Sequence, residues 1–227
     1  MEKESNVLHR MIAIAGGMYL FTASFLFAGG FASAHIFYPY LFFLVSLLIL
    51  TLYRTTPMPT ESFARSLFAQ FYCAGLLSIL NFIVFDPVTK QYFPFFALLI
   101  FIFVWVNDTF AYLTGITLGK HPLFQRVSPK KSWEGFWGGF VFVVLSSLAV
   151  AYYFPEIMNW YQSMSLGILT VIFATWGDLV ESLLKRSGGV KDSGAFFPGH
   201  GGILDRFDSI LLAAPAVFIF LELFIRN

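Results

Sequence analysis

The chain has 227 residues, of which 58% are hydrophobic, 20% aromatic and only 12% charged. Soluble domains carry about 25% charged residues, and a single soluble core of this size cannot bury so much apolar surface. An intrinsically disordered chain is excluded for the same reason, and one cysteine cannot form an internal disulfide scaffold. The composition therefore predicts an all-α fold, that of a polytopic helical integral membrane protein.

Seven apolar segments are long enough to cross about 30 Å of hydrocarbon. In chain order they are 11–33, 36–53, 67–86, 94–117, 135–154, 164–182 and 209–225. The count has a range of six to eight, because only Ala34 and His35 separate the first two segments. A signal peptide is the alternative at the start, since Ala32-Ser33-Ala34 resembles a cleavage site. The apolar stretch before it is longer than the usual signal of about 7–15 residues, so we expect a retained transmembrane helix.

The basic residues are unevenly distributed between the two sides of the membrane. Seven spans place the N-terminus and the loops 54–66, 118–134 and 183–208 on one side of the membrane. That side contains twelve of the 14 Lys and Arg residues, and the other side contains only Lys90 and Arg226. The positive-inside rule makes the first side cytoplasmic, in the cell (inner) membrane if the source is bacterial. No run of like charges suggests a nucleic-acid partner. Polar residues concentrate in the second half, which predicts a scaffold over 1–93 and a catalytic region over 94–227.

Three acidic residues, Asp108, Asp178 and Glu181, fall inside or at the edge of predicted spans. A charge at the bilayer centre costs about 2.5–3.5 kcal/mol, so each carboxylate needs a partner or a polar cavity. Asn107 and Asp108 form either a buried pair that holds helices together or part of a site, with Tyr112 on the same helix face.

The pair Asp178 and Glu181 lies on one helix face with Lys185. This arrangement is either an ion pair that anchors the helix end or part of a site.

A glycine-rich stretch follows, in which six of the 18 glycines fall between Gly188 and Gly202. Glycine lets a backbone approach phosphate oxygens closely and present its N–H groups to an anion. The same stretch contains Lys191, Asp192, His200, Asp205 and Arg206. Carboxylates of Asp178, Asp205 and Asp208 are the hard oxygen ligands that Mg²⁺ prefers, and the basic side chains can neutralise phosphate. A solvated basic loop is the weaker interpretation.

A third polar segment, 120–134, precedes the fifth span. Ser128-Pro129-Lys130-Lys131-Ser132 places hydroxyl and ammonium groups at an expected helix start, where the helix dipole favours anions. A positive-inside anchor, with Trp133 and Trp137 in the aromatic belt, is the alternative interpretation.

Together these segments resemble the signature of the phosphatidate cytidylyltransferases, also called CDP-diglyceride synthases. The signature runs from Ser182-Leu-Leu-Lys185-Arg186 through Lys191-Asp192 and Pro198-Gly-His200-Gly201-Gly202 to Asp205-Arg206-Phe-Asp208. Two further motifs match, Asn107-Asp108-Thr-Phe-Ala-Tyr112 and Ser128-Pro-Lys-Lys-Ser-Trp-Glu134-Gly. The resemblance covers about 105–210, while the first 100 residues match only in character.

The resemblance implies that CTP and phosphatidic acid react to give CDP-diacylglycerol and pyrophosphate, in phospholipid biosynthesis. It implies Mg²⁺ on Asp178, Asp205 and Asp208, with room for a second cation, and a homodimer in the lipid bilayer. The catalytic residues would be Lys185, Arg186, Lys191, Asp192, His200 and Arg206. The substrate-binding residues would be Asn107, Asp108, Tyr112, Ser128, Lys130, Lys131, Ser132, Gly201 and Gly202.

Two other enzyme classes and one other protein class remain as alternatives. A CDP-archaeol synthase-like or polyprenol kinase-like enzyme would use another lipid. An ion-coupled transporter would use Asp108, Asp178 and Glu181 as translocation sites. Transport requires a path to both faces, whereas nearly all polar groups here lie toward one face.

Overall fold

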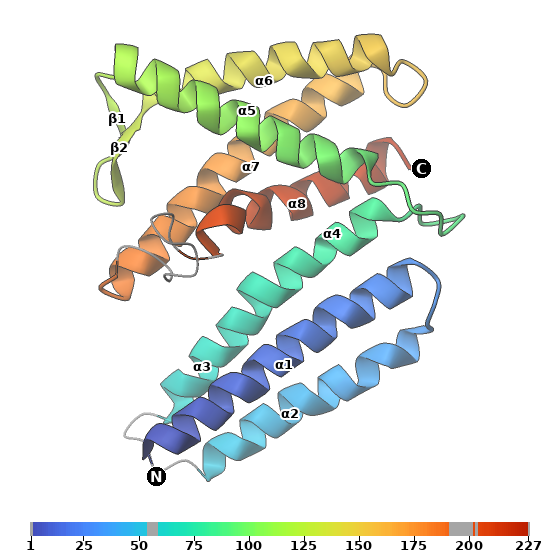
Figure 1. Ribbon diagram of the computed structural model, residues 1–227, viewed down its shortest axis with the longest axis vertical. Coiled ribbons are helices and arrows are strands. Elements are labelled where there is room, and N and C mark those ends of the chain that lie inside the picture. The colour runs from blue at the N-terminus through green and yellow to red at the C-terminus, as the bar shows by residue number, and fades with distance from the viewer. Residues whose placement is uncertain (1, 54–58, 191–201, 203, 227) are drawn as a thin grey trace. The chain divides into compact units, whose positions relative to one another are not determined.

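The computed structural model describes residues 2–53, 59–190, 202 and 204–226 (Figure 1). Within these ranges seven helical segments are long and apolar enough to cross a membrane. They confirm the predicted all-α membrane fold, so the protein is an integral membrane protein. The chain divides into two compact units between Pro94 and Phe95, and each is described by itself.

The first unit consists of three membrane-spanning helical segments. Its elements are α1 (Glu2–Ala28), the 3₁₀ turn η1 (Ala34–Phe37), α2 (Tyr38–Leu52), α3 (Pro59–Ala69), the π-helical segment η2 (Gln70–Gly75) and α4 (Leu76–Val84). The last three form one continuous span beside α1 (Figure 1). Helix α1 ends earlier than predicted because Gly30 adopts φ +74°, a left-handed conformation that suits glycine and terminates the helix.

Neutral polar side chains connect the helices of the first unit. The amide of Gln70 donates to the carbonyl of Ala13 at 2.6 Å, and the amide of Asn81 donates to the carbonyl of Phe21 at 3.0 Å. Both amides are buried. Because hydrocarbon offers no hydrogen bonds, buried amides in a membrane protein need such partners, and here they fasten α1 to the third span.

The second unit contains four long helices and a short hairpin. Its elements are α5 (Phe95–Leu118), β1 (Pro122–Phe124), β2 (Ser128–Ser132), α6 (Trp133–Tyr153), α7 (Trp160–Ser187) and α8 (Leu204–Phe224). Helix α5 packs along α6, and α7 packs along α8, with further contacts of α7 to α5 and α6 (Figure 1). The fully buried core includes Phe103 on α5, Leu166 on α7 and Leu211 on α8.

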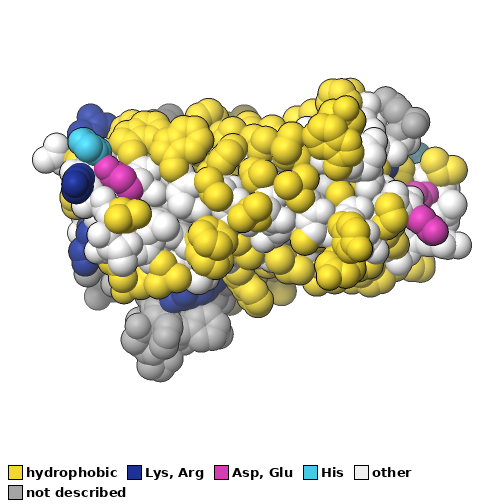
Figure 2. Space-filling model, turned by 90° about the horizontal axis from the view of Figure 1, so that it is seen from above, with side chains coloured by type: hydrophobic (Ala, Val, Ile, Leu, Met, Phe, Trp, Pro, Cys, Tyr) yellow, Lys and Arg dark blue, Asp and Glu magenta, His cyan; other side chains and the backbone are white. Residues whose placement is uncertain are grey.

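Apolar side chains also cover the outside of the helices, as expected where lipid is the solvent. Trp137, Val141, Leu145 and Leu148 make one such surface along α6 and are all exposed. Figure 2 shows hydrophobic side chains over most of the visible surface, with only a few charged groups among the described residues on that face. The aromatic and aliphatic residues that a soluble protein could not bury are therefore exposed on the helix surfaces, where contact with lipid suits them.

The helix start predicted at 128–132 was wrong. Residues 128–131 do not open a helix: they belong to β2, which pairs antiparallel with β1, and α6 begins only at Trp133. Ser132 is the N-cap, and its hydroxyl accepts a hydrogen bond from the backbone N–H of Gly135 at 3.1 Å. Proline at 122 and at 129 favours extended backbone in the preceding residue, which accounts for strand rather than helix.

Helices α7 and α8 are longer than the apolar segments that predicted them. Helix α7 continues to Ser187, and α8 begins at Leu204 instead of 209. Asp205 and Asp208 therefore lie on the first turns of a helix, where acidic side chains interact favourably with the helix dipole, and the loop predicted to end at 208 is shorter.

Candidate active site

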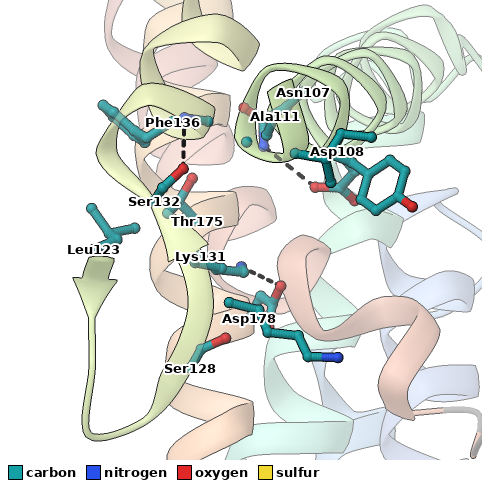
Figure 3. A pocket seen from close by; sticks show the side chains of 15 residues that line it. Asn107, Asp108, Ala111, Leu123, Ser128, Lys131, Ser132, Phe136, Thr175 and Asp178 are labelled. Carbon is teal, nitrogen blue, oxygen red and sulfur yellow. Dashed lines mark hydrogen bonds and ion pairs between the residues drawn. The ribbon is translucent and has the colours of Figure 1, made fainter. Parts of the chain in front are cut away.

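A cavity of about 730 Å³ opens in the second unit between α5, the hairpin, the start of α6 and α7 (Figure 3). It is lined by Asn107, Asp108, Ala111, Tyr112, Gly115, Ile116, Leu123, Ser128, Lys130, Lys131, Ser132, Gly135, Phe136, Thr175 and Asp178. These residues come from three segments that the sequence separates by up to 71 positions. The fold thus gathers in one cavity most of the residues predicted to bind substrate.

Helix α5 supplies the first wall of the cavity. Asn107, Asp108, Ala111, Tyr112 and Gly115 repeat at helical spacing and so share one face. Asn107 is buried, and its side-chain amide donates to the Asp108 carboxylate at 3.3 Å. The two sequence-based interpretations of this pair are compatible, because Asn107 is packed in the helix interface while Asp108 is exposed to the cavity.

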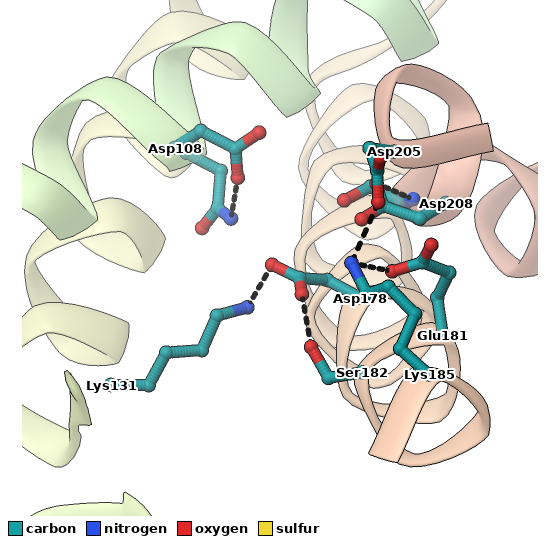
Figure 4. Close-up of polar contacts among 10 residues, drawn as sticks. Asp108, Lys131, Asp178, Glu181, Ser182, Lys185, Asp205 and Asp208 are labelled. Carbon is teal, nitrogen blue, oxygen red and sulfur yellow. Dashed lines mark hydrogen bonds and ion pairs between the residues drawn. The ribbon is translucent and has the colours of Figure 1, made fainter. Parts of the chain in front are cut away.

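The hairpin supplies the second wall and its positive charge. Lys131, on β2, forms an ion pair with Asp178 on α7, 47 residues away (Figures 3 and 4). The same carboxylate accepts a hydrogen bond from the Ser182 hydroxyl at 3.2 Å. Both members of the ion pair are partly accessible, with side-chain exposures of 31% for the lysine and 29% for the aspartate. An exposed pair of this kind can be separated by an incoming anion or cation at modest cost.

Glycines on α6 let this helix approach α5 closely beside the cavity. A Cβ atom added to Gly135 would lie 2.7 Å from the carbonyl oxygen of Ala111, which is closer than side chains pack. A Cβ atom at Gly139 would collide with the side chain and the carbonyl of Asn107. Small residues at such crossings are typical of membrane helices, and here they set the position of Asn107 and Asp108.

A second charged cluster lies where α7 meets α8 (Figure 4). The Lys185 ammonium pairs with the fully buried Glu181 carboxylate, one helical turn away, and with Asp205 at 2.7 Å. Asp205 also accepts a hydrogen bond from the backbone N–H of Gly202 at 2.7 Å. The sequence predicted the Glu181–Lys185 spacing, and the structure adds Asp205 as the second carboxylate on the same cation.

Asp208 lies on α8, three residues after Asp205, at the point where α8 approaches α7 (Figure 4). The approach of α8 to α7 at this point depends on Gly177, because a Cβ atom there would lie 2.5 Å from the Asp208 carbonyl and 3.1 Å from the Cα of Ser209. Gly177, directly before Asp178, therefore sets the separation between α7 and α8, the two helices that carry the predicted metal ligands.

The remaining predicted site residues are distributed as follows. Arg186 and Arg206 are exposed near the second cluster, and Gly202 is buried. Lys191, Asp192, His200 and Gly201 lie outside the described residues, so their predicted roles stay predictions.

The described residues contain no group of three His, Cys, Asp or Glu side chains arranged to hold a metal ion. Two of the three carboxylates predicted to bind Mg²⁺ are instead paired with lysines, Asp178 with Lys131 and Asp205 with Lys185. Both pairs would have to rearrange before these oxygens could coordinate a cation.

Comparison with known proteins gives the family. The model of the cytidylyltransferase family matches residues 1–224. The chain belongs to the cytidylyltransferase family. The phosphatidate cytidylyltransferase of Staphylococcus aureus strain COL is 46% identical over 121 residues, which are 53% of this chain and 46% of the relative. That of Staphylococcus epidermidis strain ATCC 12228 is 44% identical over 126 residues, 56% of this chain and 48% of the relative.

Membership of the cytidylyltransferase family confirms the resemblance found in the motifs. The matched region spans about half the length of the curated relatives. The cavity described above contains residues of two of the three motifs.

Several residues of the cavity were not predicted from the sequence. Thr175 lies three residues before Asp178 on the same helix face, a spacing that could have identified it. Leu123, Ile116 and Phe136 are ordinary apolar residues of membrane segments and give no signal. Glu134 appeared only as part of a motif, and its contacts are visible only in the structure.

Proposed function

We propose that the protein transfers a cytidylyl group from CTP to phosphatidic acid, forming CDP-diacylglycerol and releasing pyrophosphate. The observation that carries the proposal is the cavity between membrane helices in which Lys130, Lys131, Asp108 and Asp178 converge, in a chain of the cytidylyltransferase family. The relatives named phosphatidate cytidylyltransferase support the same substrates.

The reaction is a displacement at phosphorus. An oxygen of the phosphatidate phosphate attacks the α-phosphorus of CTP, the bond from that phosphorus to the bridging oxygen of the β-phosphate breaks, and pyrophosphate leaves with the electron pair. A phosphate monoester is already ionised at neutral pH, so no general base has to remove a proton from the nucleophile. Bringing two anions together is the main difficulty, and positioning and charge neutralisation supply most of the acceleration.

The basic side chains around the cavity suit that task. Lys130 and Lys131 lie on β2 at its edge, and Lys185 lies farther along α7 from Asp178. Within the described part of the chain Lys131 is held by one partly exposed carboxylate, so it can exchange Asp178 for a phosphate oxygen. Lys185 is held by two carboxylates and is only 17% exposed. It is therefore better suited to holding α7 against α8 than to exchanging these carboxylates for a phosphate.

The lining of the cavity also suits a lipid substrate. Leu123, Ile116 and Phe136 provide apolar surface beside the charged groups. Phosphatidate keeps its acyl chains in the bilayer while its phosphate must reach a water-soluble nucleotide. A cavity with both kinds of surface, built on membrane helices, meets both requirements.

We also propose Mg²⁺ as the cofactor, with Asp178, Asp205 and Asp208 as the ligand candidates. Their carboxylate oxygens are the donors that this ion prefers. Asp205 is the least available of the three, because one of its oxygens is bonded to Lys185 and the other accepts a hydrogen bond from the backbone N–H of Gly202. When bound, the ion would neutralise the triphosphate and help pyrophosphate to leave.

The side of the membrane on which CTP binds is proposed to be the cytoplasm. Twelve of the 14 Lys and Arg residues fall on the N-terminus, on the loops of one side or near the ends of the spans next to those loops in the seven-span topology. The positive-inside rule assigns that side to the cytoplasm.

The test is a reconstitution of the purified full chain in lipid nanodiscs. CTP labelled at the α-phosphate and phosphatidate should yield labelled CDP-diacylglycerol and one pyrophosphate per product, and EDTA should stop the reaction until Mg²⁺ is restored. Ester- and ether-linked phosphatidates run in parallel define the lipid. If no lipid supports release of pyrophosphate from CTP, the proposed function is wrong.

A further inference from the structure

Glu134 makes three contacts at the base of the hairpin, outside the cavity that the hairpin lines. One carboxylate oxygen, Oε2, accepts hydrogen bonds from the backbone N–H groups of Lys120 and His121, at 3.1 and 3.2 Å. The other, Oε1, lies 2.6 Å from Nδ1 of the His121 ring. Glu134 is on the first turn of α6, while Lys120 and His121 connect α5 to β1. One side chain thus joins the segments that enter and leave the hairpin.

The hairpin itself is a weak element. It is a two-stranded ribbon of three and five residues, with an irregular register between the pairs Pro122–Ser132 and Phe124–Ser128. Isolated two-stranded hairpins are marginally stable, so the contacts at the base matter for its orientation. A backbone hydrogen bond there, from the Trp133 N–H to the His121 carbonyl at 2.9 Å, accompanies the Glu134 contacts.

The orientation of this ribbon decides where its lysines lie. Lys130, Lys131 and Ser132 follow one another on β2 directly before α6 and line the cavity. Lys131 reaches across to Asp178 on α7. A rotation of the hairpin about its base would carry the Lys131 ammonium away from that carboxylate.

We propose that Glu134 is a positioning residue for phosphate binding: it clamps the base of the hairpin and thereby sets Lys131 opposite Asp178. The inference rests on the proposed function, because it gives Lys131 the task of holding substrate phosphate. Glu134 itself is not among the residues that line the cavity. Its carboxylate is suited to the task because charge-assisted hydrogen bonds to backbone N–H groups are stronger than neutral ones.

A purely structural role for Glu134 is the competing explanation. An acidic side chain on the first turn of α6 also interacts favourably with the helix dipole. Such a role predicts lower stability of α6 without a specific link to Lys131. The two roles are therefore separated by coupling between residues 134 and 131, which do not contact each other in any hydrogen bond or ion pair of the described residues.

The first test is a double-mutant cycle on the transferase reaction of the full chain. Glu134→Ala should lower kcat/KM on the order of ten- to a hundredfold, with a raised KM for CTP, because small misplacements of a positioned group have effects of that size. In a Lys131→Met background the same change should cost less than about threefold. Glu134→Gln should recover part of the activity, since its amide oxygen can still accept the backbone N–H groups. If Glu134→Ala lowers kcat/KM by the same factor with and without Lys131→Met, the proposal is overturned.

The second test measures placement without turnover. Lys131→Cys and Asp178→Cys are combined with Cys73→Ser, and the rate of cross-linking by a short bis-maleimide is recorded with and without Glu134→Ala. The proposal predicts a severalfold slower cross-link; an unchanged rate overturns it. Glu222→Gln, which alters an ion pair with Arg226 near the opposite end of α8, is the matched control and should leave both tests unchanged.

The two tests also distinguish this inference from the proposed function. If the full chain transfers no cytidylyl group and cross-linking still depends on Glu134, the proposed function fails and the clamp stands. If transfer is normal and cross-linking ignores Glu134, the clamp fails and the proposed function stands.

Discussion

The two units each contain a cavity between membrane helices, and the two cavities differ in chemistry. The cavity of the first unit, of about 500 Å³, lies between α1 and the third span and has Ala13, Ile14, Gly17, Met18 and Leu77 among its lining residues. Among the described residues that line it, none is charged. The cavity of the second unit is lined by two carboxylates and two ammonium groups.

The polar groups that connect helices in the two units differ in the same way. In the first unit Gln70 and Asn81 are neutral amides whose hydrogen bonds go to the carbonyls of α1. In the second unit Lys131 and Asp178 neutralise each other and remain partly exposed. Charge inside a membrane is expensive, so its concentration in the cavity of one unit makes that cavity the candidate site.

The largest expected effect comes from removing charge from the second cavity. Asp178→Asn should reduce turnover by at least about a hundredfold, because it removes the partner of Lys131 and a candidate metal ligand at once. Initial rates in nanodiscs, with gel filtration to confirm folding, measure this. Turnover near the unmodified rate would contradict the assignment of the second unit as the catalytic one.

A smaller effect is expected from the contact between α7 and α8 at Gly177, next to Asp178. Gly177→Ala places a methyl group against the backbone of α8 and should cost about 1–3 kcal/mol of stability, with a loss of activity of about tenfold. Gly75→Ala in the first unit is the control, because its Cβ would lie 3.5 Å from the Gln70 carbonyl, an ordinary contact. Thermal unfolding in detergent and initial rates compare the two variants. Equal losses of stability and activity in the two variants would contradict a special role for Gly177.

The first unit should respond in stability alone. Gln70→Ala removes hydrogen bonds to the Ala13 carbonyl and from the Tyr40 hydroxyl and should lower stability by about 1–2 kcal/mol. Turnover per folded molecule should stay within about twofold of the unmodified rate, since the hydrogen bonds given for this amide stay within the first unit. A large fall in that quantity would show that this unit takes part in the reaction.

The smallest effect is expected at Thr22 in the apolar cavity. Its hydroxyl donates to the Met18 carbonyl of its own helix at 2.9 Å, a bond that joins no second element. Thr22→Val should therefore change stability by less than about 0.5 kcal/mol and leave turnover unaltered. A marked loss of lipid turnover, measured as in the other variants, would give this cavity a part in substrate binding.

The sequence by itself determined the number of spans and the residues that make up the motifs. Seven apolar stretches fix the class of fold because each must satisfy its backbone groups within one helix in lipid. The spacing of Glu181 and Lys185 predicted their ion pair, since residues four apart on a helix are neighbours. The motif residues at 107–112, 128–132 and 178 were likewise identifiable from their residue types and spacing alone.

Only the tertiary structure decided which of these residues meet. It placed Lys131 on a strand, opposite an aspartate 47 residues away, and gave Lys185 a second carboxylate from α8. It also gave roles to two residues that the sequence did not single out. Gly177 allows α7 and α8 to approach closely, and Glu134 holds the base of the hairpin. Local sequence encodes hydrophobic length and helical spacing, whereas contacts between distant segments depend on how whole helices pack, and that is a property of the folded unit.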